Sequence, residues 1–208
     1  MGHGKPIEYR SKKDILALFE ENDIIYLERT RIAWKELLSI RLDESPYYQE
    51  NKDIFEELLE QYCACVKNNE MAPIYIKYIG ADIGYGVFAA EDIGKDEFIG
   101  EYAGVVQIYD EDEDPGDAEN GYSTDYSWYY LDELENGPVL EINGKREGNE
   151  MRFVNHSPTP NVDVEHMLYD GQWIIFFKAS RLIKKNEQLL ISYGEEYWND
   201  GFRDICNI

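Results

Sequence analysis

Cysteine is scarce in this chain, with only Cys63, Cys65 and Cys206 among 208 residues. An odd number of cysteines, two of them one residue apart, does not supply a disulfide framework. Three cysteines also cannot complete a four-ligand zinc site unless a histidine joins them. We therefore expect no structural metal ion, and a reducing, intracellular setting for the protein.

Basic residues are also few, because 20 lysines and arginines stand against 43 aspartates and glutamates, for a net charge of −23. Nucleic acids and anionic membrane surfaces are bound mainly through lysine and arginine, so the composition argues against direct contact with either. The negative field favours a basic protein or peptide partner. Solubility alone is an equally good explanation of this charge.

Long apolar runs are missing, since no stretch approaches membrane-spanning length and no signal-peptide pattern opens the chain. The apolar fraction of 43% and the 17 tyrosines are nevertheless enough to build a core. The length suits one domain with a flanking element, or two small domains. We expect an intracellular protein, in the nucleus or the cytoplasm, or in a host nucleus if it is a bacterial effector.

The first stretch, residues 1–70, is predicted to be a helical segment. Ser11 and Asp14 form a capping box at the start of one helix, and Ser45-Pro46 is a signal for one helix to stop and another to begin. Three apolar faces have helical spacing: Ile15, Leu18 and Phe19; Ile32, Trp34, Leu37, Leu38 and Leu42; and Ile54, Phe55, Leu58, Leu59 and Tyr62. We expect two or three helices here, which dock on the rest of the chain, bind a partner or form a dimer.

The pattern changes at Met71-Ala72-Pro73, and from there it is typical of short strands with frequent turns. The predicted strands span residues 74–79, 87–90, 98–107 (a pair around Gly104), 127–131, 139–142, 162–168 and 173–178. Many strands with little helix between them predict a compact, mainly β domain.

An acidic loop, residues 110–119, interrupts the predicted strands. Its alternating aspartates suggest calcium, but an EF-hand loop that starts at Asp110 needs glycine and glutamate where Pro115 and Gly121 stand. We therefore expect a solvated loop with no metal site. Attraction of a cationic substrate segment remains an alternative role for it.

Four blocks in the second part of the chain carry chemistry. They are Gly84-Tyr85-Gly86-Val87-Phe88-Ala89-Ala90, Phe98-Ile99-Gly100-Glu101-Tyr102-Ala103-Gly104, Asn155-His156-Ser157 with Pro160-Asn161, and residues 187–194, which read Glu-Gln-Leu-Leu-Ile-Ser-Tyr-Gly. In this order they resemble the signature segments of SET-domain protein lysine methyltransferases. The resemblance does not extend to residues 1–70.

The resemblance implies a mainly β, SET-like fold of several small curved sheets with a knot-like C-terminal segment, preceded by the α-helical N-terminal segment. It divides the chain into three parts. These are the helical segment (1–70), the SET-like catalytic domain (71–194) and a C-terminal aromatic lid (195–208). The family's cysteine-rich zinc cap is absent after the last block, where Cys206 stands alone.

The family's methyl donor is S-adenosylmethionine, and the resemblance implies which residues hold it. They are Gly84, Tyr85, Gly86, Arg152, Asn155, His156, Tyr193 and Trp198. Glycines let the backbone approach a ligand closely, and Trp198 would cover the adenine. Taken alone, Asn155-His156 is more typical of a turn with a buried histidine. For Trp198 the alternative is simple packing in a C-terminal helix.

The resemblance places Tyr193 at the centre of catalysis and Tyr102 beside it, at a narrow channel for the substrate lysine. The other residues expected to line this channel are Ile191, Trp128, Tyr129 and Tyr130. Gln188 and Ser192 depart from the family's usual acidic residues. Ile191 stands where a tyrosine can hold a water that limits the product, so we expect room for di- or trimethylation.

The sequence therefore predicts a protein-lysine N-methyltransferase that uses S-adenosylmethionine and releases S-adenosylhomocysteine. A histone tail is the expected substrate, because the chain is acidic and the family often acts on histones. The alternatives are a lysine methyltransferase of a non-histone protein and a non-catalytic module that binds basic tails.

Overall fold

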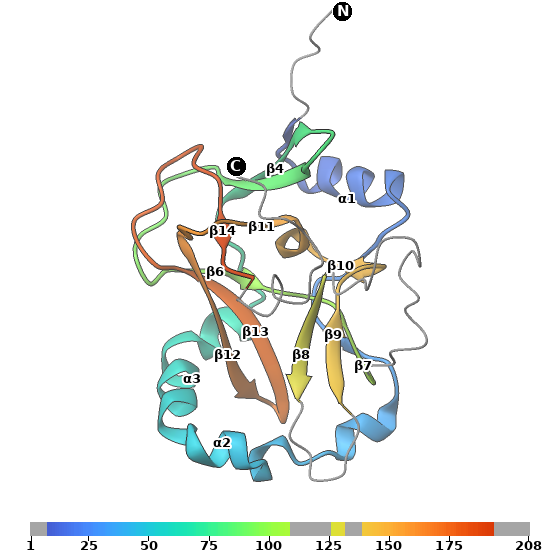
Figure 1. Ribbon diagram of the computed structural model, residues 1–208, viewed down its shortest axis with the longest axis vertical. Helices are drawn as coiled ribbons and strands as arrows, with labels where there is room; N and C mark the ends of the chain where they lie inside the picture. The colour runs from blue at the N-terminus through green and yellow to red at the C-terminus, as the bar shows by residue number, and fades with distance from the viewer. Residues whose placement is uncertain (1–7, 109–125, 132–138, 194–208) are drawn as a thin grey trace, which may run out of the picture.

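The computed structural model describes residues 8–108, 126–131 and 139–193 (Figure 1). Its α-helices are α1 (Lys12–Glu21), α2 (Pro46–Glu50) and α3 (Lys52–Lys67), and its 3₁₀ helices are η1 (Lys35–Ser39), η2 (Leu42–Glu44) and η3 (Glu150–Phe153). None of the helices in this described part is long and apolar enough to cross a membrane.

Helices α1 and α2 begin where the sequence predicts. The Ser11 hydroxyl accepts a hydrogen bond from the Asp14 amide and the Asp14 carboxylate accepts one from the Ser11 amide, each at 3.2 Å, which completes the capping box. Ser45 caps α2, with Pro46 at its first position. The apolar face of α1 is buried at Ile15, Leu18 and Phe19.

The second predicted helical face, over residues 32–42, does not form an α-helix, so this expectation was wrong. Arg31–Ile32 is instead a strand, β3, which pairs in parallel with Val105 and Val106. The residues after it form η1 and η2. A β-branched residue such as Ile32 suits a strand, and pairing with a distant strand overrides the local helical spacing.

Five small sheets hold the described strands. The strands are β1 (Glu8–Tyr9), β2 (Ile25–Tyr26), β3 (Arg31–Ile32), β4 (Ile74–Gly80), β5 (Gly84–Ala89), β6 (Phe98–Glu101), β7 (Val105–Ile108), β8 (Ser127–Leu131), β9 (Leu140–Asn143), β10 (Glu147–Gly148), β11 (Asn155–His156), β12 (Val162–Tyr169), β13 (Gln172–Ala179) and β14 (Leu190–Ile191). The strand orders are β1-β4-β5, β12-β13-β6, β3-β7-β9-β8, β10-β2 and β11-β14. The expected mainly β fold of several small sheets is confirmed.

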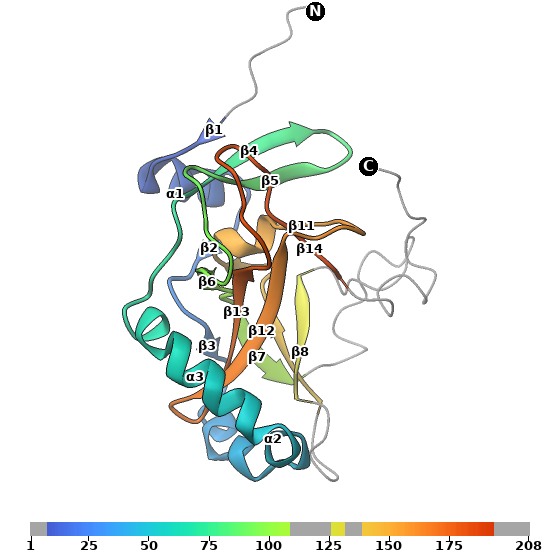
Figure 2. The same cartoon turned by 90° about the vertical axis from the view of Figure 1, so that its left-hand side faces the viewer.

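Residues 8–70 are built into these sheets. Each of the strands β1, β2 and β3 pairs with a strand from the later part of the chain. Helix α3 lies across the β12-β13 hairpin, as Figure 2 shows. There Tyr62 and Val66 pack with Met167, Ile174 and Phe176 in a separate buried cluster. The described helices therefore dock on the β part, one of the three roles expected for them.

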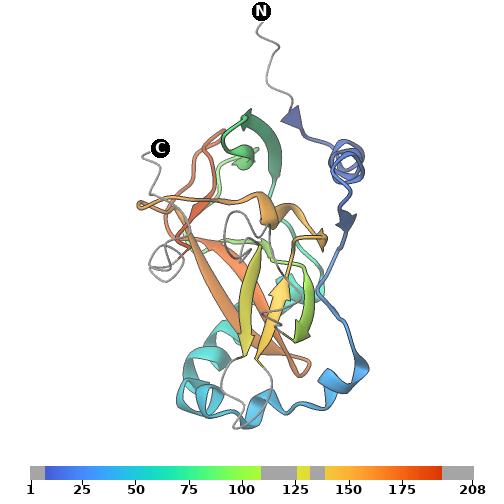
Figure 3. The ribbon, with the colours of Figure 1, turned by 45° about the vertical axis from the view of Figure 1, so that its right-hand side comes forward.

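The parallel pairing of β11 with β14 joins the two most informative sequence segments, for Asn155 lies opposite Leu190 and His156 opposite Ile191. The Asn161 side chain fixes this register, because its Nδ2 donates to the Gln188 carbonyl and its Oδ1 accepts from the Leu190 amide, each at 2.8 Å. The knot-like C-terminal segment stays a prediction, and residues 194–208 lie outside the described part. In Figure 3 the sheet of β7, β8 and β9 lies beside the β12-β13 hairpin.

Candidate active site

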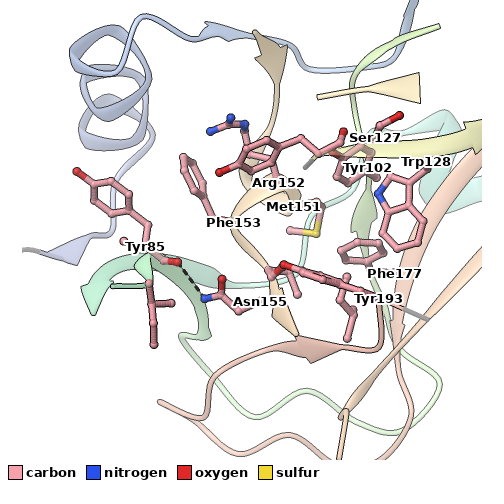
Figure 4. A pocket seen from close by; sticks show the side chains of 15 residues that line it. Tyr85, Tyr102, Ser127, Trp128, Met151, Arg152, Phe153, Asn155, Phe177 and Tyr193 are labelled. Atoms are coloured by element: carbon pink, nitrogen blue, oxygen red, sulfur yellow. Dashed lines mark hydrogen bonds between the residues drawn. The ribbon is translucent and has the colours of Figure 1, made fainter. Parts of the chain in front are cut away.

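A cavity of about 250 Å³ lies beside the β11-β14 pair (Figure 4). Its lining residues are Ile83, Gly84, Tyr85, Tyr102, Tyr126, Ser127, Trp128, Met151, Arg152, Phe153, Val154, Asn155, Phe177, Ile191 and Tyr193. In Figure 4 Tyr85 and Asn155 lie toward one end, Trp128, Phe177 and Tyr102 toward the other, and Tyr193 between them. The cavity thus has Asn155 and Tyr85 at one end, and the rings of Trp128, Phe177 and Tyr102 at the other.

The amide end of the cavity is formed where β5 meets β11. Asn155 Nδ2 donates to the Tyr85 carbonyl at 3.0 Å. Gly84 has φ +78°, a conformation that favours glycine. At Gly86 a Cβ would lie 2.9 Å from Gln188 Nε2 and 3.1 Å from Asn155 Nδ2, so the glycine allows these side chains their close approach.

Arg152 brings a buried positive charge to the cavity wall. Its Nε donates to the Gly144 carbonyl at 2.9 Å and its Nη2 to the Lys145 carbonyl at 3.0 Å. The guanidinium carbon lies 4.2 Å from the centre of the Tyr126 ring. Burial lowers the pKa of Arg152, but an arginine stays protonated at neutral pH. Its fixed charge therefore suits an anionic group in the cavity.

Tyr193 is held at both its backbone and its hydroxyl. Its amide donates to His156 Nδ1 at 3.1 Å, and its hydroxyl donates to the Val154 carbonyl at 3.2 Å. The His156 and Tyr193 rings lie 5.3 Å apart. His156 does not line the cavity but fixes Tyr193, which does. The Asn155-His156 pair thus has one residue at the cavity and one behind the tyrosine.

The bond from Tyr193 to His156 predicts a pH dependence. Burial lowers the pKa of His156 from 6.5, which keeps Nδ1 able to accept at neutral pH. As pH falls below 6.5, the unfolded chain takes up this proton before the folded chain, so the free energy of unfolding falls with pH toward the lowered folded pKa. Above 6.5 both states are neutral and the dependence ends.

This pH dependence can be measured by urea unfolding between about pH 5 and pH 7.5. We expect a smaller pH slope in His156→Asn, whose amide oxygen can accept the same bond without titrating. The remaining slope includes His166, whose pKa burial also lowers, and Glu101, whose pKa burial raises and whose contribution to the slope therefore has the opposite sign. An equal slope in the variant and the natural protein would contradict the role of His156.

Tyr102 lies at the aromatic end of the cavity, and its side chain is buried. Its hydroxyl donates to the Tyr126 carbonyl at 2.6 Å. Its ring is 6.0 Å from that of Trp128 and 6.1 Å from that of Phe177. Burial raises the pKa of Tyr102, so the hydroxyl stays protonated and acts as a donor.

Of the aromatic run in β8, the structure brings Trp128 to the cavity and leaves Tyr129 and Tyr130 away from it. Tyr129 is 68% exposed on the opposite face of the strand, because neighbouring side chains alternate. Tyr130 is buried, and its hydroxyl accepts from the Trp173 amide at 2.9 Å. These two tyrosines therefore do not line the described cavity, contrary to the expectation, and Trp198 lies outside the described residues.

Sequence reasoning missed several lining residues. Ile83, Tyr126, Ser127, Met151, Phe153, Val154 and Phe177 line the cavity although no role was predicted for them. Phe153 and Val154 lie directly before the Asn-His motif, and that proximity was the only available signal for them. Within residues 8–108, 126–131 and 139–193, no group of three or more histidine, cysteine or acidic side chains could hold a metal ion.

Comparison with known families matches the profile described as "SET domain" to residues 84–194. The chain belongs to the SET domain family. The match begins at Gly84 and ends just after Tyr193, so it includes all four sequence blocks and both ends of the cavity.

Individual relatives agree with this assignment. This SET domain is 34% identical over 122 residues to the histone-lysine N-methyltransferase MEDEA of Arabidopsis thaliana, a match that covers 57% of this chain and 17% of MEDEA. The chain spans less than a third of the length of the curated relatives it matches.

Two solved structures show the same fold. ATXR5 in complex with a histone H3.1 peptide mono-methylated on R26 superposes with a TM-score of 0.65 at 20% identity, over 89% of this chain and 88% of that one. The ctPRC2 complex from Chaetomium thermophilum, bound to S-adenosylmethionine, has a TM-score of 0.53 at 30% identity, over 66% of this chain and 16% of that one. The ATXR5 match covers most of residues 8–70 as well.

Proposed function

We propose that this SET domain is a protein-lysine N-methyltransferase that uses S-adenosylmethionine. The observation that carries the proposal is that Asn155, Tyr193 and Tyr102 line the same cavity. The Asn155 amide, which can orient the polar part of the methyl donor, lies at one end of the cavity. The hydroxyls of the buried Tyr102 and the half-buried Tyr193 lie where a lysine amine would arrive. The ctPRC2 structure bound to S-adenosylmethionine supports the choice of donor.

The described residues fit this donor. Asn155 offers amide chemistry and Arg152 a positive charge for its polar methionine part. Gly84 lets the backbone come close, and Gly86 leaves room for the Asn155 side chain. When bound, S-adenosylmethionine supplies a methyl group whose bond to sulfur breaks as a bond to the lysine nitrogen forms, and the sulfonium becomes a neutral thioether. We propose cofactor roles for Gly84, Tyr85, Gly86, Arg152, Asn155, His156 and Tyr193, with His156 acting through Tyr193.

The chain's own contribution is alignment and exclusion of water. A lysine must lose its proton to attack, and the rings of Trp128, Phe177 and Tyr102 disfavour the charged ammonium form. The Tyr193 hydroxyl, near Val154, is placed to orient the neutral amine. A direct displacement needs such alignment more than strong acid–base groups.

We propose a histone tail as the substrate. The net charge of −23 attracts a lysine-rich segment, and the ATXR5 neighbour was solved with a histone H3.1 peptide. A histone substrate makes a nucleus the proposed site of action. Ile191 lies on the cavity wall and has no hydroxyl, so it cannot hold the water with which a tyrosine at this position would limit the product. This supports a di- or trimethylated product.

The proposal is tested by incubating the full chain with radiolabelled S-adenosylmethionine and each core histone. We expect label on a histone lysine, with mass spectrometry showing at least the dimethyl form at saturating donor. Donor affinity is measured in parallel by calorimetry. Donor binding without transfer to any histone would point to a non-histone substrate, and tail binding without donor binding would point to a non-catalytic module.

A further inference from the structure

Gly144, in the turn after β9, does not line the cavity but contacts three residues that do. Its amide donates to the Tyr126 carbonyl at 2.8 Å. Its own carbonyl accepts from Arg152 Nε at 2.9 Å. A Cβ built on Gly144 would overlap the Tyr102 hydroxyl and lie 3.0 Å from Tyr102 Cζ. The hydroxyl therefore occupies the space that a side chain at position 144 would fill.

Tyr102 has little freedom to yield to such a side chain. It is 3% exposed, and its hydroxyl is already bonded to the Tyr126 carbonyl, which also accepts from Gly144. Trp128 and Phe177 pack against its ring. A Cβ at position 144 would push the hydroxyl away from the Gly144 backbone, and the open space that Tyr102 faces is the cavity.

Backbone strain does not explain a glycine at this position. Among the described glycines, positive φ values occur at Gly84 and Gly171, so alanine can adopt the backbone of Gly144. The remaining reason for glycine is the space it leaves beside Tyr102.

We infer that Gly144 is a specificity-determining residue. Because it has no side chain, it leaves room for the Tyr102 hydroxyl, and this keeps the lysine end of the cavity wide enough for a nitrogen that already carries methyl groups. This inference rests on the proposed function. Each round of transfer forms one carbon–nitrogen bond, breaks one carbon–sulfur bond and releases one proton from the nitrogen to water. A partly methylated nitrogen is bulkier and has fewer N–H donors, so the position of the Tyr102 hydroxyl decides whether a further round fits.

Gly144→Ala tests this inference. The substrates are histone peptides unmethylated, monomethylated or dimethylated at the lysine that the natural protein modifies. We expect kcat/KM for the dimethylated peptide to fall at least about tenfold relative to the unmethylated one, since one methylene in a pocket has this scale of effect. Gly80→Ala is the matched control, because a Cβ there meets nothing within 4 Å. It should leave the product ratio unchanged.

The same change is then made in the Tyr102→Phe background. The hydroxyl that collides with the new methyl group is gone there, so Gly144→Ala should shift the product ratio less than it does beside Tyr102. Urea unfolding of the single and double variants should show that the two changes are not additive. This measurement needs no activity and also covers the case in which Gly144→Ala alone folds poorly.

The outcomes separate the two claims. A natural protein that transfers no methyl group to any peptide would refute the proposed function. An active protein whose product ratio is the same in folded Gly144→Ala, or additive unfolding energies for positions 144 and 102, would overturn the inference alone.

Discussion

Tyr193→Phe is expected to lower kcat for methyl transfer by about 100-fold, the scale at which misplacing a reacting group by an ångström slows a reaction. The ring and the backbone bond to His156 Nδ1 should survive this change, because neither uses the hydroxyl. What is lost is the hydroxyl that donates to the Val154 carbonyl and faces the cavity. The fold and donor affinity should therefore change little.

The measurement compares kcat and kcat/KM for a histone peptide, with donor affinity by calorimetry. Equal losses in kcat and kcat/KM would indicate an interaction made in the transition state. Tyr169→Phe, which removes a hydroxyl from a half-buried tyrosine on β12 away from the cavity lining, serves as the control. Full activity in Tyr193→Phe would refute the central role of this tyrosine.

Phe19→Ala is expected to destabilise the protein by about 3–5 kcal/mol, the usual cost of removing a fully buried phenylalanine. Phe19 is 1% exposed. Its ring meets Tyr26 at 5.1 Å and Phe153 at 5.5 Å, both edge to face. Phe153 lines the cavity, so helix α1 supports the active-site wall from behind.

Chemical unfolding measures this cost, and calorimetry of donor binding measures its effect on the site. Leu16→Ala is the matched control, because Leu16 lies on the same helix and is 43% exposed; it should cost less than about 1 kcal/mol. A small loss in Phe19→Ala would mean that α1 contributes little to the fold. If Phe19→Ala lost the expected stability of about 3–5 kcal/mol but bound the donor with unchanged affinity, α1 would stabilise the fold without supporting the active site.

The strands of four or more residues were predictable because alternation of side chains is a local property, whereas the two-residue strands are absent from the predicted set. Predicted spans such as 162–168 and 173–178 differ by a residue or so from β12 and β13. The capping box at Ser11 was predictable for the same reason, since its partners are three residues apart. The prediction of a helical face over residues 32–42 was wrong because the apolar spacing there is local, whereas β3 pairs with β7, more than 70 positions later.

The sequence by itself determined the family, the mainly β fold and part of the cavity lining, such as Asn155 and Arg152, because motifs carry residue identity and order. Only the tertiary structure decided which tyrosines reach the cavity. Tyr102 and Tyr193 do, while Tyr129 faces solvent and Tyr130 supports Trp173. It also decided that a glycine outside every motif lies against Tyr102. The physical reason is that contact depends on how distant strands pair and pack, which no local pattern records.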